Sequence, residues 1–197
     1  MPGLSETGSE DVRFMVLRGN PQKLDPIPDR SVHLVVTAPP AWPVPRSAAG
    51  ASGFGAGLDY PAFLNELEGV LREVFRLLVP GGRMVCIASD IWLSRRSHGR
   101  HQVIPFAADI GLCCRKIGFD HLTPVIWHRP VGRRTPAFLG KPYEPNGGIP
   151  SDTAVMLMQR KPGGYRKPTA EQRRRSRIER DRYRKWFQQV WTAVADP

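Results

Sequence analysis

The stretch that decides the fold is Val32-His33-Leu34-Val35-Val36-Thr37-Ala38-Pro39-Pro40-Ala41-Trp42. Its first half is an apolar run typical of a buried strand. The two prolines have no N–H to donate to a sheet, so the strand must end near Thr37 and the backbone must turn away. Open α/β sheets bind their ligands at this place, beyond the carboxyl end of a strand. We therefore expect residues 38–42 to line a functional site.

Apolar patterns on both sides of this stretch predict an α/β sheet. A helix is expected over residues 60–78, because its apolar side chains share one face and Pro80-Gly81-Gly82 follows. A second helix is expected over residues 103–117. Strands are expected over residues 14–17, 32–37, 83–88, 122–127 and 154–159, with the first three forming a parallel core.

Length and charge predict one α/β domain over residues 12–161, between a loose N-terminus (1–11) and a basic linker and helix (162–197). The chain has 197 residues, is 41% hydrophobic and carries a net charge of +11. Twelve Lys and Arg against three Asp and Glu lie between Arg160 and Lys185. Such a surplus favours a polyanionic partner. Thr169 and Gln172 form a capping box for a helix that is basic first and aromatic later.

Cysteine and histidine usage predicts no metal site and no disulfide framework. Cys86, Cys113 and Cys114 are odd in number and form no Cys-x-x-Cys pair, which indicates reduced thiols in a cytoplasmic protein. His98 and His101 have no further ligand placed near them in the sequence, so a solvated basic loop is expected there. No apolar run is long enough to span a membrane, and no membrane partner is expected.

Residues 37–42 resemble Thr-Ser-Pro-Pro-Tyr-Trp, the catalytic motif of the amino-methylating DNA methyltransferases, which act on cytosine N4 or adenine N6. Four of the six residues match. Further family motifs follow in the same order, and the resemblance covers residues 12–191. They are the family's Gly-Asp at Gly19-Asn20, its long helix, Pro-Gly-Gly and strand at 60–88, its Ile-Ile-Trp-x-Lys-Pro at 125–130, and its Arg-Lys-Pro-Gly strand end at 155–163.

The resemblance implies a partial Rossmann-like methyltransferase sheet with S-adenosylmethionine as cofactor and double-stranded DNA as partner. In the family, the polar side chain of the motif and the carbonyl of its first proline accept hydrogen bonds from the target amino group. The motif's tyrosine stacks on the flipped base. The resemblance thus assigns catalytic roles to residues of this loop, and two of them are altered, because Ala38 has no acceptor and Ala41 has no ring. The assigned residues are Ala38, Pro39, Pro40, Ala41 and Trp42, with Trp42 the candidate to replace the stack.

Cofactor and DNA contacts follow from the same comparison. Asn20 stands where the family has its Gly-Asp, and Asp90 follows a strand of the sheet, so both are candidate cofactor residues; the alternative for Asp90 is a helix cap. Clustered arginines on a DNA-related protein favour phosphate contact over a merely solvated helix face. The candidate DNA-binding residues are Arg133, Arg134, Arg173, Arg174, Arg175 and Arg177.

The family's cofactor motif, Asp-Pro-Phe-x-Gly-Ser-Gly, is expected downstream of the target-recognition region, and the sequence ends at Pro197 before it. Phe54-Gly55-Ala56-Gly57 matches superficially, but it follows a loop, so a mobile loop over the base is the better interpretation. Three hypotheses stay open. The first is a site-specific DNA methyltransferase, of cytosine N4 rather than adenine N6. The second is a DNA-binding pseudo-methylase, or half of a split enzyme completed by a second chain or a self-dimer. The third is an RNA-binding protein that uses only the basic tail.

Overall fold

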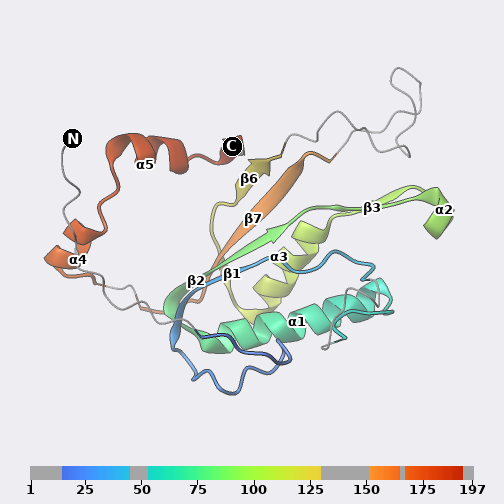
Figure 1. Cartoon of the computed structure of the whole chain (residues 1–197), viewed down its shortest axis with the longest axis horizontal. Coiled ribbons are helices and arrows are strands. Elements are labelled where there is room, and N and C mark those ends of the chain that lie inside the picture. The colour runs from blue at the N-terminus through green and yellow to red at the C-terminus, as the bar shows by residue number, and fades with distance from the viewer. Residues whose placement is uncertain (1–14, 45–52, 130–150, 165–166, 193–197) are drawn as a thin grey trace.

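A computed structural model of the protein describes residues 15–44, 53–129, 151–164 and 167–192. One mixed sheet carries the fold (Figure 1), in the order β1-β2-β7-β6-β8 with the short β5 beside β7. The strands are β1 (Val32–Thr37), β2 (Leu78–Ala88), β5 (Asp120–His121), β6 (Val125–His128), β7 (Thr153–Arg160) and β8 (Val190–Thr192).

The strand directions decide where a site can form. β1 is parallel to β2, whereas β7 is antiparallel to both β2 and β6. Hence β1, β2 and β6 run the same way, and their carboxyl ends share one edge of the sheet. The expected α/β sheet is confirmed, but only β1 and β2 form a parallel pair among the strands assigned to the parallel core.

Two helices, α1 (Tyr60–Leu77) and α3 (Phe106–Ile117), cover one face of this sheet. The Asp59 side chain caps α1 by accepting a hydrogen bond from the Ala62 N–H at 2.9 Å. The apolar face of α1 packs on α3 and on the alternate residues of β2 that point toward the helices. This core includes Phe63, Leu67, Leu71, Met84, Cys86, Ile110 and Cys114, all at most 3% exposed.

The opposite face of the sheet has no helix over it within the described residues. Leu34 and Val36 of β1 point to this face and are 56% and 64% exposed. Their partners in the register are Arg83 and Val85 of β2. A hollow of about 600 Å³ lies over the same strands. The outer edge of β1 likewise pairs with no described strand.

A hairpin leaves the sheet after β2 and corrects one predicted boundary. It consists of β3 (Ile91–Leu93), α2 (Arg95–His98) and β4 (Gln102–Ile104). The helix predicted over residues 103–117 therefore begins only at Phe106. A proline disfavours helical backbone at the residue before it, so Ile104 stays extended ahead of Pro105.

The N-terminal and C-terminal segments also differ from expectation. The strand predicted over residues 14–17 does not form over residues 15–17, which are the described part of that range. Met15 and Val16 are coil and 76% and 95% exposed, and none of the described strands pairs with them. Phe14 lies outside the described residues.

The predicted C-terminal helix is divided into α4 (Ala170–Arg175) and α5 (Arg180–Trp186). The capping box of Thr169 and Gln172 is confirmed. β8 then joins the sheet beside β6, so the segment after residue 161 contributes a strand to the α/β domain.

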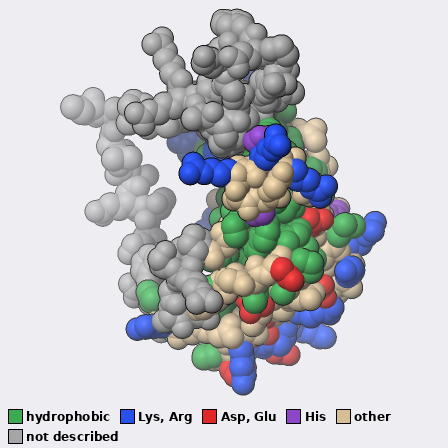
Figure 2. Space-filling model, turned by 90° about the vertical axis from the view of Figure 1, so that its right-hand side faces the viewer, with side chains coloured by type: hydrophobic (Ala, Val, Ile, Leu, Met, Phe, Trp, Pro, Cys, Tyr) green, Lys and Arg blue, Asp and Glu red, His purple; other side chains and the backbone are tan. Residues whose placement is uncertain are grey.

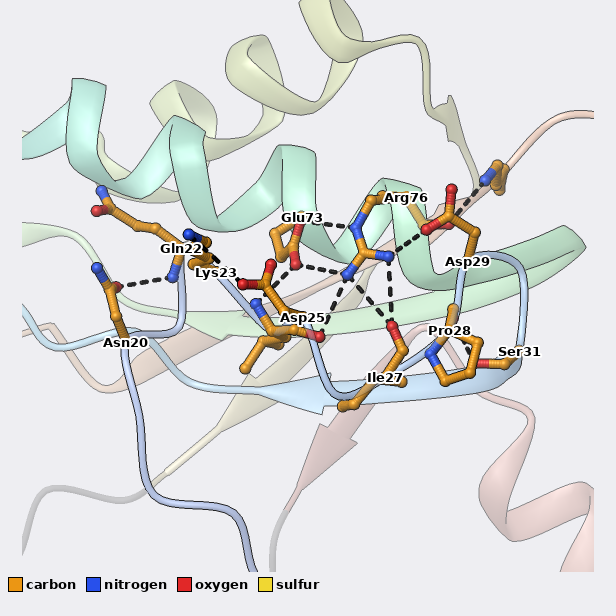
Figure 3. Close-up of polar contacts among 12 residues, drawn as sticks. Asn20, Gln22, Lys23, Asp25, Ile27, Pro28, Asp29, Ser31, Glu73 and Arg76 are labelled. Atoms are coloured by element: carbon orange, nitrogen blue, oxygen red, sulfur yellow. Dashed lines mark hydrogen bonds and ion pairs between the residues drawn. The ribbon is translucent and has the colours of Figure 1, made fainter.

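A polar network holds the chain before β1 against α1 (Figure 3). The Arg76 guanidinium pairs with Glu73 and Asp29 and also donates to the carbonyl oxygens of Leu24 and Ile27. These contacts fix the entry to β1 and, with it, the position where that strand ends.

None of the described helices is both long and apolar enough to cross a membrane. Cys86, Cys113 and Cys114 are buried free thiols, and burial raises the pKa of Cys86 to about 12. They are therefore core residues that stay protonated at neutral pH.

Candidate active site

The candidate catalytic loop leaves the carboxyl end of β1, as the sequence predicts. Ala38, Pro40 and Ala41 are exposed, whereas Pro39 is half-buried. No backbone N–H among the described turns and loops donates to the Pro39 carbonyl oxygen. The small exposed side chains of Ala38 and Ala41 thus lie at the edge of the candidate site.

Trp42 fixes the far end of this loop. Its indole N–H donates a hydrogen bond of 2.8 Å to the Leu58 carbonyl oxygen. Its ring meets Tyr60 edge-to-face at 5.4 Å between centroids, and lies 5.8 Å from the His98 ring. These contacts make Trp42 an anchor that joins the loop to the start of α1 and to the hairpin. Stacking of Trp42 on a base stays a prediction.

A polar pair lies beneath this anchor. The Tyr60 hydroxyl donates to Asp109 Oδ2 at 2.6 Å. Burial raises the pKa of Tyr60 well above its ordinary value, and the bond to Asp109 raises it further. The pair lines a pocket of about 480 Å³, together with Trp42, His98 and Arg100. Aromatic walls with a few polar groups are typical of sites for planar ligands.

The two candidate cofactor residues lie at the surface. Asn20 is in an exposed turn, where its Oδ1 accepts from the Gln22 N–H at 2.9 Å. Gln22 in turn donates to the Glu66 carbonyl of α1. Asp90 is exposed directly after β2, and its charge contributes to the raised pKa of Tyr60. The cofactor roles of Asn20 and Asp90 stay predictions.

The glycine motif at residues 54–57 does not form a phosphate cradle. The Gly55 N–H already donates to Glu66 Oε2 at 2.8 Å. Gly55 has a φ of +71°, and a Cβ there would lie 2.8 Å from the Phe63 ring. A glycine is therefore required at this position for close packing on α1. The described part of the predicted mobile loop packs against the core. Residues 45–52 lie outside the described residues.

One residue at this edge was missed by sequence reasoning. Arg129, just beyond β6, donates to Ser89 Oγ at 2.9 Å, and Ser89 follows β2. Its guanidinium also lies 5.5 Å from the centre of the Trp127 ring. Arg129 thus joins the ends of two strands. The signal in the sequence was its place just after a predicted strand, two residues after Trp127.

The predicted DNA-binding arginines do not lie beside the loop. Arg173, Arg174 and Arg175 are on α4, at the left of Figure 1, whereas the loop after β1 runs to the right end, near α2. Arg177 follows α4 on the same exposed arm. Arg133 and Arg134 lie outside the described residues. Within the described residues, no three His, Cys, Asp or Glu side chains are grouped as metal ligands.

Parallel strands ending at a Pro-Pro loop, with two helices on one face, define a Rossmann-like methyltransferase fold. The solved structure of PvuII DNA methyltransferase, which is cytosine-N4-specific, shares this fold, with a TM-score of 0.55 and 16% identity over 73% of this chain and 47% of that one. No family model matches the sequence.

The curated relatives that this chain resembles are type II DNA methyltransferases, which confirms the resemblance recognised from the sequence. A candidate DNA modification methylase of Thermus thermophilus, crystallised with S-adenosyl-L-methionine, is 46% identical with a TM-score of 0.71, over 89% of this chain and 65% of that one. Type II methyltransferase M.MjaI of Methanocaldococcus jannaschii is 29% identical over 92% of this chain and 67% of its own length. M.MthZI of Methanothermobacter thermautotrophicus is 26% identical, and the chain spans 52% of its length. The chain thus spans between half and two thirds of these relatives.

Proposed function

We propose that this chain is the catalytic-loop part of an S-adenosylmethionine-dependent DNA methyltransferase that modifies an exocyclic amino group, cytosine N4 in preference to adenine N6. One observation carries the proposal. The Pro39-Pro40 turn leaves the carboxyl end of β1, in a fold that a protein crystallised with S-adenosyl-L-methionine shares at 46% identity. The proposed substrate is duplex DNA, and the proposed location is the cytoplasm.

The loop can do part of the required chemistry. An exocyclic amino group is a weak nucleophile, because its lone pair is delocalised into the ring. Accepting its N–H hydrogens concentrates electron density on the nitrogen, and the exposed side of the Pro39 turn offers a carbonyl for one of them. Ala38 offers no second acceptor, and the loss of one such group costs roughly 10²–10³ in rate. The missing ring at Ala41 costs about 1–3 kcal/mol of stacking.

The sheet supports a further element of the proposal. The outer edge of β1 has no described partner, and Leu34 and Val36 beside it are more than half exposed. The coil at residues 15–17 is apolar and exposed as well. We propose that polypeptide outside these 197 residues supplies the cofactor-binding strand here, either continuing this chain or on a second one. The greater length of the relatives supports this.

A second candidate is a DNA-binding protein without methyltransferase activity. Ala38 and Ala41 favour it, since both positions lack the groups that the family's chemistry uses. A third, an RNA-binding protein, has support only from the basic arm after residue 161. Neither of these two candidates needs S-adenosylmethionine, so cofactor binding distinguishes both from a methyltransferase.

Calorimetric titration tests the proposal. The chain is joined after Trp191 to the remaining third of the Thermus thermophilus relative and titrated with S-adenosylmethionine, with and without duplex DNA. We expect cofactor binding that duplex DNA strengthens. Binding of duplex DNA without any binding of S-adenosylmethionine would favour the non-methylating candidate. Tighter binding of RNA than of duplex DNA would favour the RNA-binding candidate.

A further inference from the structure

We propose that the hairpin of residues 91–104 is a DNA-binding element that contacts backbone phosphates beside the catalytic loop. The inference rests on the proposed function, since it takes duplex DNA as the polymer that approaches this edge. It assigns a role to a segment that the sequence suggested was only a solvated basic loop.

The hairpin concentrates positive charge at its tip. Arg95, Arg96 and Arg100 lie within six residues, and no Asp or Glu occurs between residues 91 and 104. All three arginines are exposed, as are His98 and His101. None of the three arginines forms an ion pair with a carboxylate of the described residues. Like charges this close repel one another, and a bound polyanion relieves that repulsion.

The tip stands on a rigid base. Ile91, Leu93 and Ile104 are each 7% exposed and belong to the hydrophobic core. The two strands pair from Ile91–Ile104 to Leu93–Gln102. At the tip, the Ser94 hydroxyl accepts from the Ser97 N–H, and Gly99 ends α2 with a φ of +73°. The arginines are therefore presented by defined structure.

The hairpin lies on the same end of the molecule as the catalytic loop (Figures 1 and 2). The His98 ring contacts Trp42 of that loop at 5.8 Å between centroids. His98 and Arg100 also line the pocket above Asp109. Figure 2 looks onto this end and shows basic side chains and histidines around the protruding tip, above a hydrophobic area.

The hairpin lies where the basic residues of α4 do not reach. The arginines of α4 lie at the opposite end of the described fold, so they cannot hold the duplex next to the loop. Asp90 and Asp109 place negative charge near the same site, which alone repels phosphates. The hairpin arginines offset that charge where a duplex must approach the loop. Because arginine binds phosphate in a bidentate manner, three of them suit a backbone contact.

The experiment measures duplex binding as a function of salt. A variant carrying Arg95→Gln, Arg96→Gln and Arg100→Gln is compared with a control carrying Lys23→Gln, Arg115→Gln and Lys116→Gln. Both variants remove three positive charges from exposed positions. The slope of log K against log salt flattens by about 0.9 for each phosphate that the protein no longer neutralises. We expect a flattening of about 2–3 in the hairpin variant, and no more than a small parallel decrease of affinity in the control.

Two further measurements complete the test. Arg96→Glu alone is expected to weaken duplex binding at least fivefold at low salt, with an unchanged melting temperature because the side chain is exposed. Equal slopes in the hairpin and control variants would overturn the inference and leave net charge as the only cause. The assay needs no methyl transfer. A flattened slope in a chain that never methylates would therefore reject the proposed function and keep the hairpin's role.

Discussion

The hydroxyl of Tyr60 donates a hydrogen bond of 2.6 Å to Oδ2 of Asp109 and thereby joins the first residue of α1 to the first turn of α3. The same Tyr60 ring supports Trp42 from below. The position of the candidate catalytic loop thus depends on the packing of α1 against α3.

Replacing Tyr60 with Phe tests this link. The change removes one hydrogen bond to a carboxylate and keeps the ring. A bond to a charged group contributes about 1.5–3 kcal/mol, and partial exposure of Tyr60 lowers that to about 1 kcal/mol. We expect the free energy of unfolding, measured by urea denaturation at pH 7, to fall by that amount. An unchanged midpoint would mean that the bond does not stabilise the fold.

The stability difference between the parent and Tyr60→Phe is expected to depend on pH. The pKa of Tyr60 is raised in the folded state above its ordinary 10.0, first by burial and then by Asp109. The folded state therefore holds the phenol proton more tightly, so this stabilisation is complete below pH 10 and is lost as pH rises beyond it. We expect the stability advantage of the parent over Tyr60→Phe to shrink above pH 10. Parallel stability curves across that range would contradict the shift.

Arg76 is expected to control the segment before β1. Substituting Met removes its bonds to Glu73, to Asp29 and to two carbonyl oxygens while keeping much of its apolar length. We expect faster hydrogen exchange over residues 22–31, with the amides of β2 unchanged. Arg76→Lys keeps the charge but not the forked geometry, so its exchange rates over residues 22–31 should lie between those of the parent and of Arg76→Met. Equal exchange rates over residues 22–31 in the parent and both variants would show that other contacts hold this segment.

The 197-residue chain alone is expected to bind S-adenosylmethionine weakly or not at all. The Gly55 N–H is used by Glu66, and the edge of β1 has no described partner strand. Calorimetry on the purified chain checks this. A micromolar dissociation constant would contradict it and would place Asn20 and Asp90 in a site that is complete within these residues.

The α4 arm is expected to add affinity without directing chemistry. Changing Arg173, Arg174, Arg175 and Arg177 to Ala should flatten the salt dependence of duplex binding, because each neutralised phosphate releases counterions. In a chimera that methylates, the methyl-transfer rate at saturating DNA should change by no more than about twofold on these substitutions, because the arm lies away from the loop. An unchanged salt slope would identify these arginines as a solvated surface only.

The parts of the fold that local chemistry determines could be predicted from sequence. Pro39-Pro40 ends β1 at Thr37, and the apolar face of residues 60–77 forms α1 as expected. Predictions were wrong where a distant partner decides. The strand at residues 14–17 needs a neighbour to form, and without it the expected parallel core has no first member. The start of α3 moved to Phe106 because Ile104 pairs with Ile91 in the hairpin and is followed by Pro105.

The site followed the same division. The turn after β1 could be predicted because Pro39-Pro40 directly after a strand is a local feature. The contact of Trp42 with His98, the bond from Tyr60 to Asp109 and the bond from Arg129 to Ser89 each join elements that are distant in sequence. No spacing rule in a single sequence reveals such pairs. The same holds for the distance between the α4 arginines and the loop.

The most direct measurement is methyl transfer from labelled S-adenosylmethionine to duplex DNA by the chimera joined after Trp191, with the parent loop and with Ala38→Ser plus Ala41→Tyr. Serine restores an acceptor for the amino hydrogen, and tyrosine restores the stacking ring. The account predicts at least a tenfold higher rate for the double variant, about 1.4 kcal/mol of transition-state stabilisation, and a partial gain for Ala38→Ser alone. If the double variant binds cofactor and DNA but transfers methyl no faster than the parent, the catalytic assignment of this loop is contradicted.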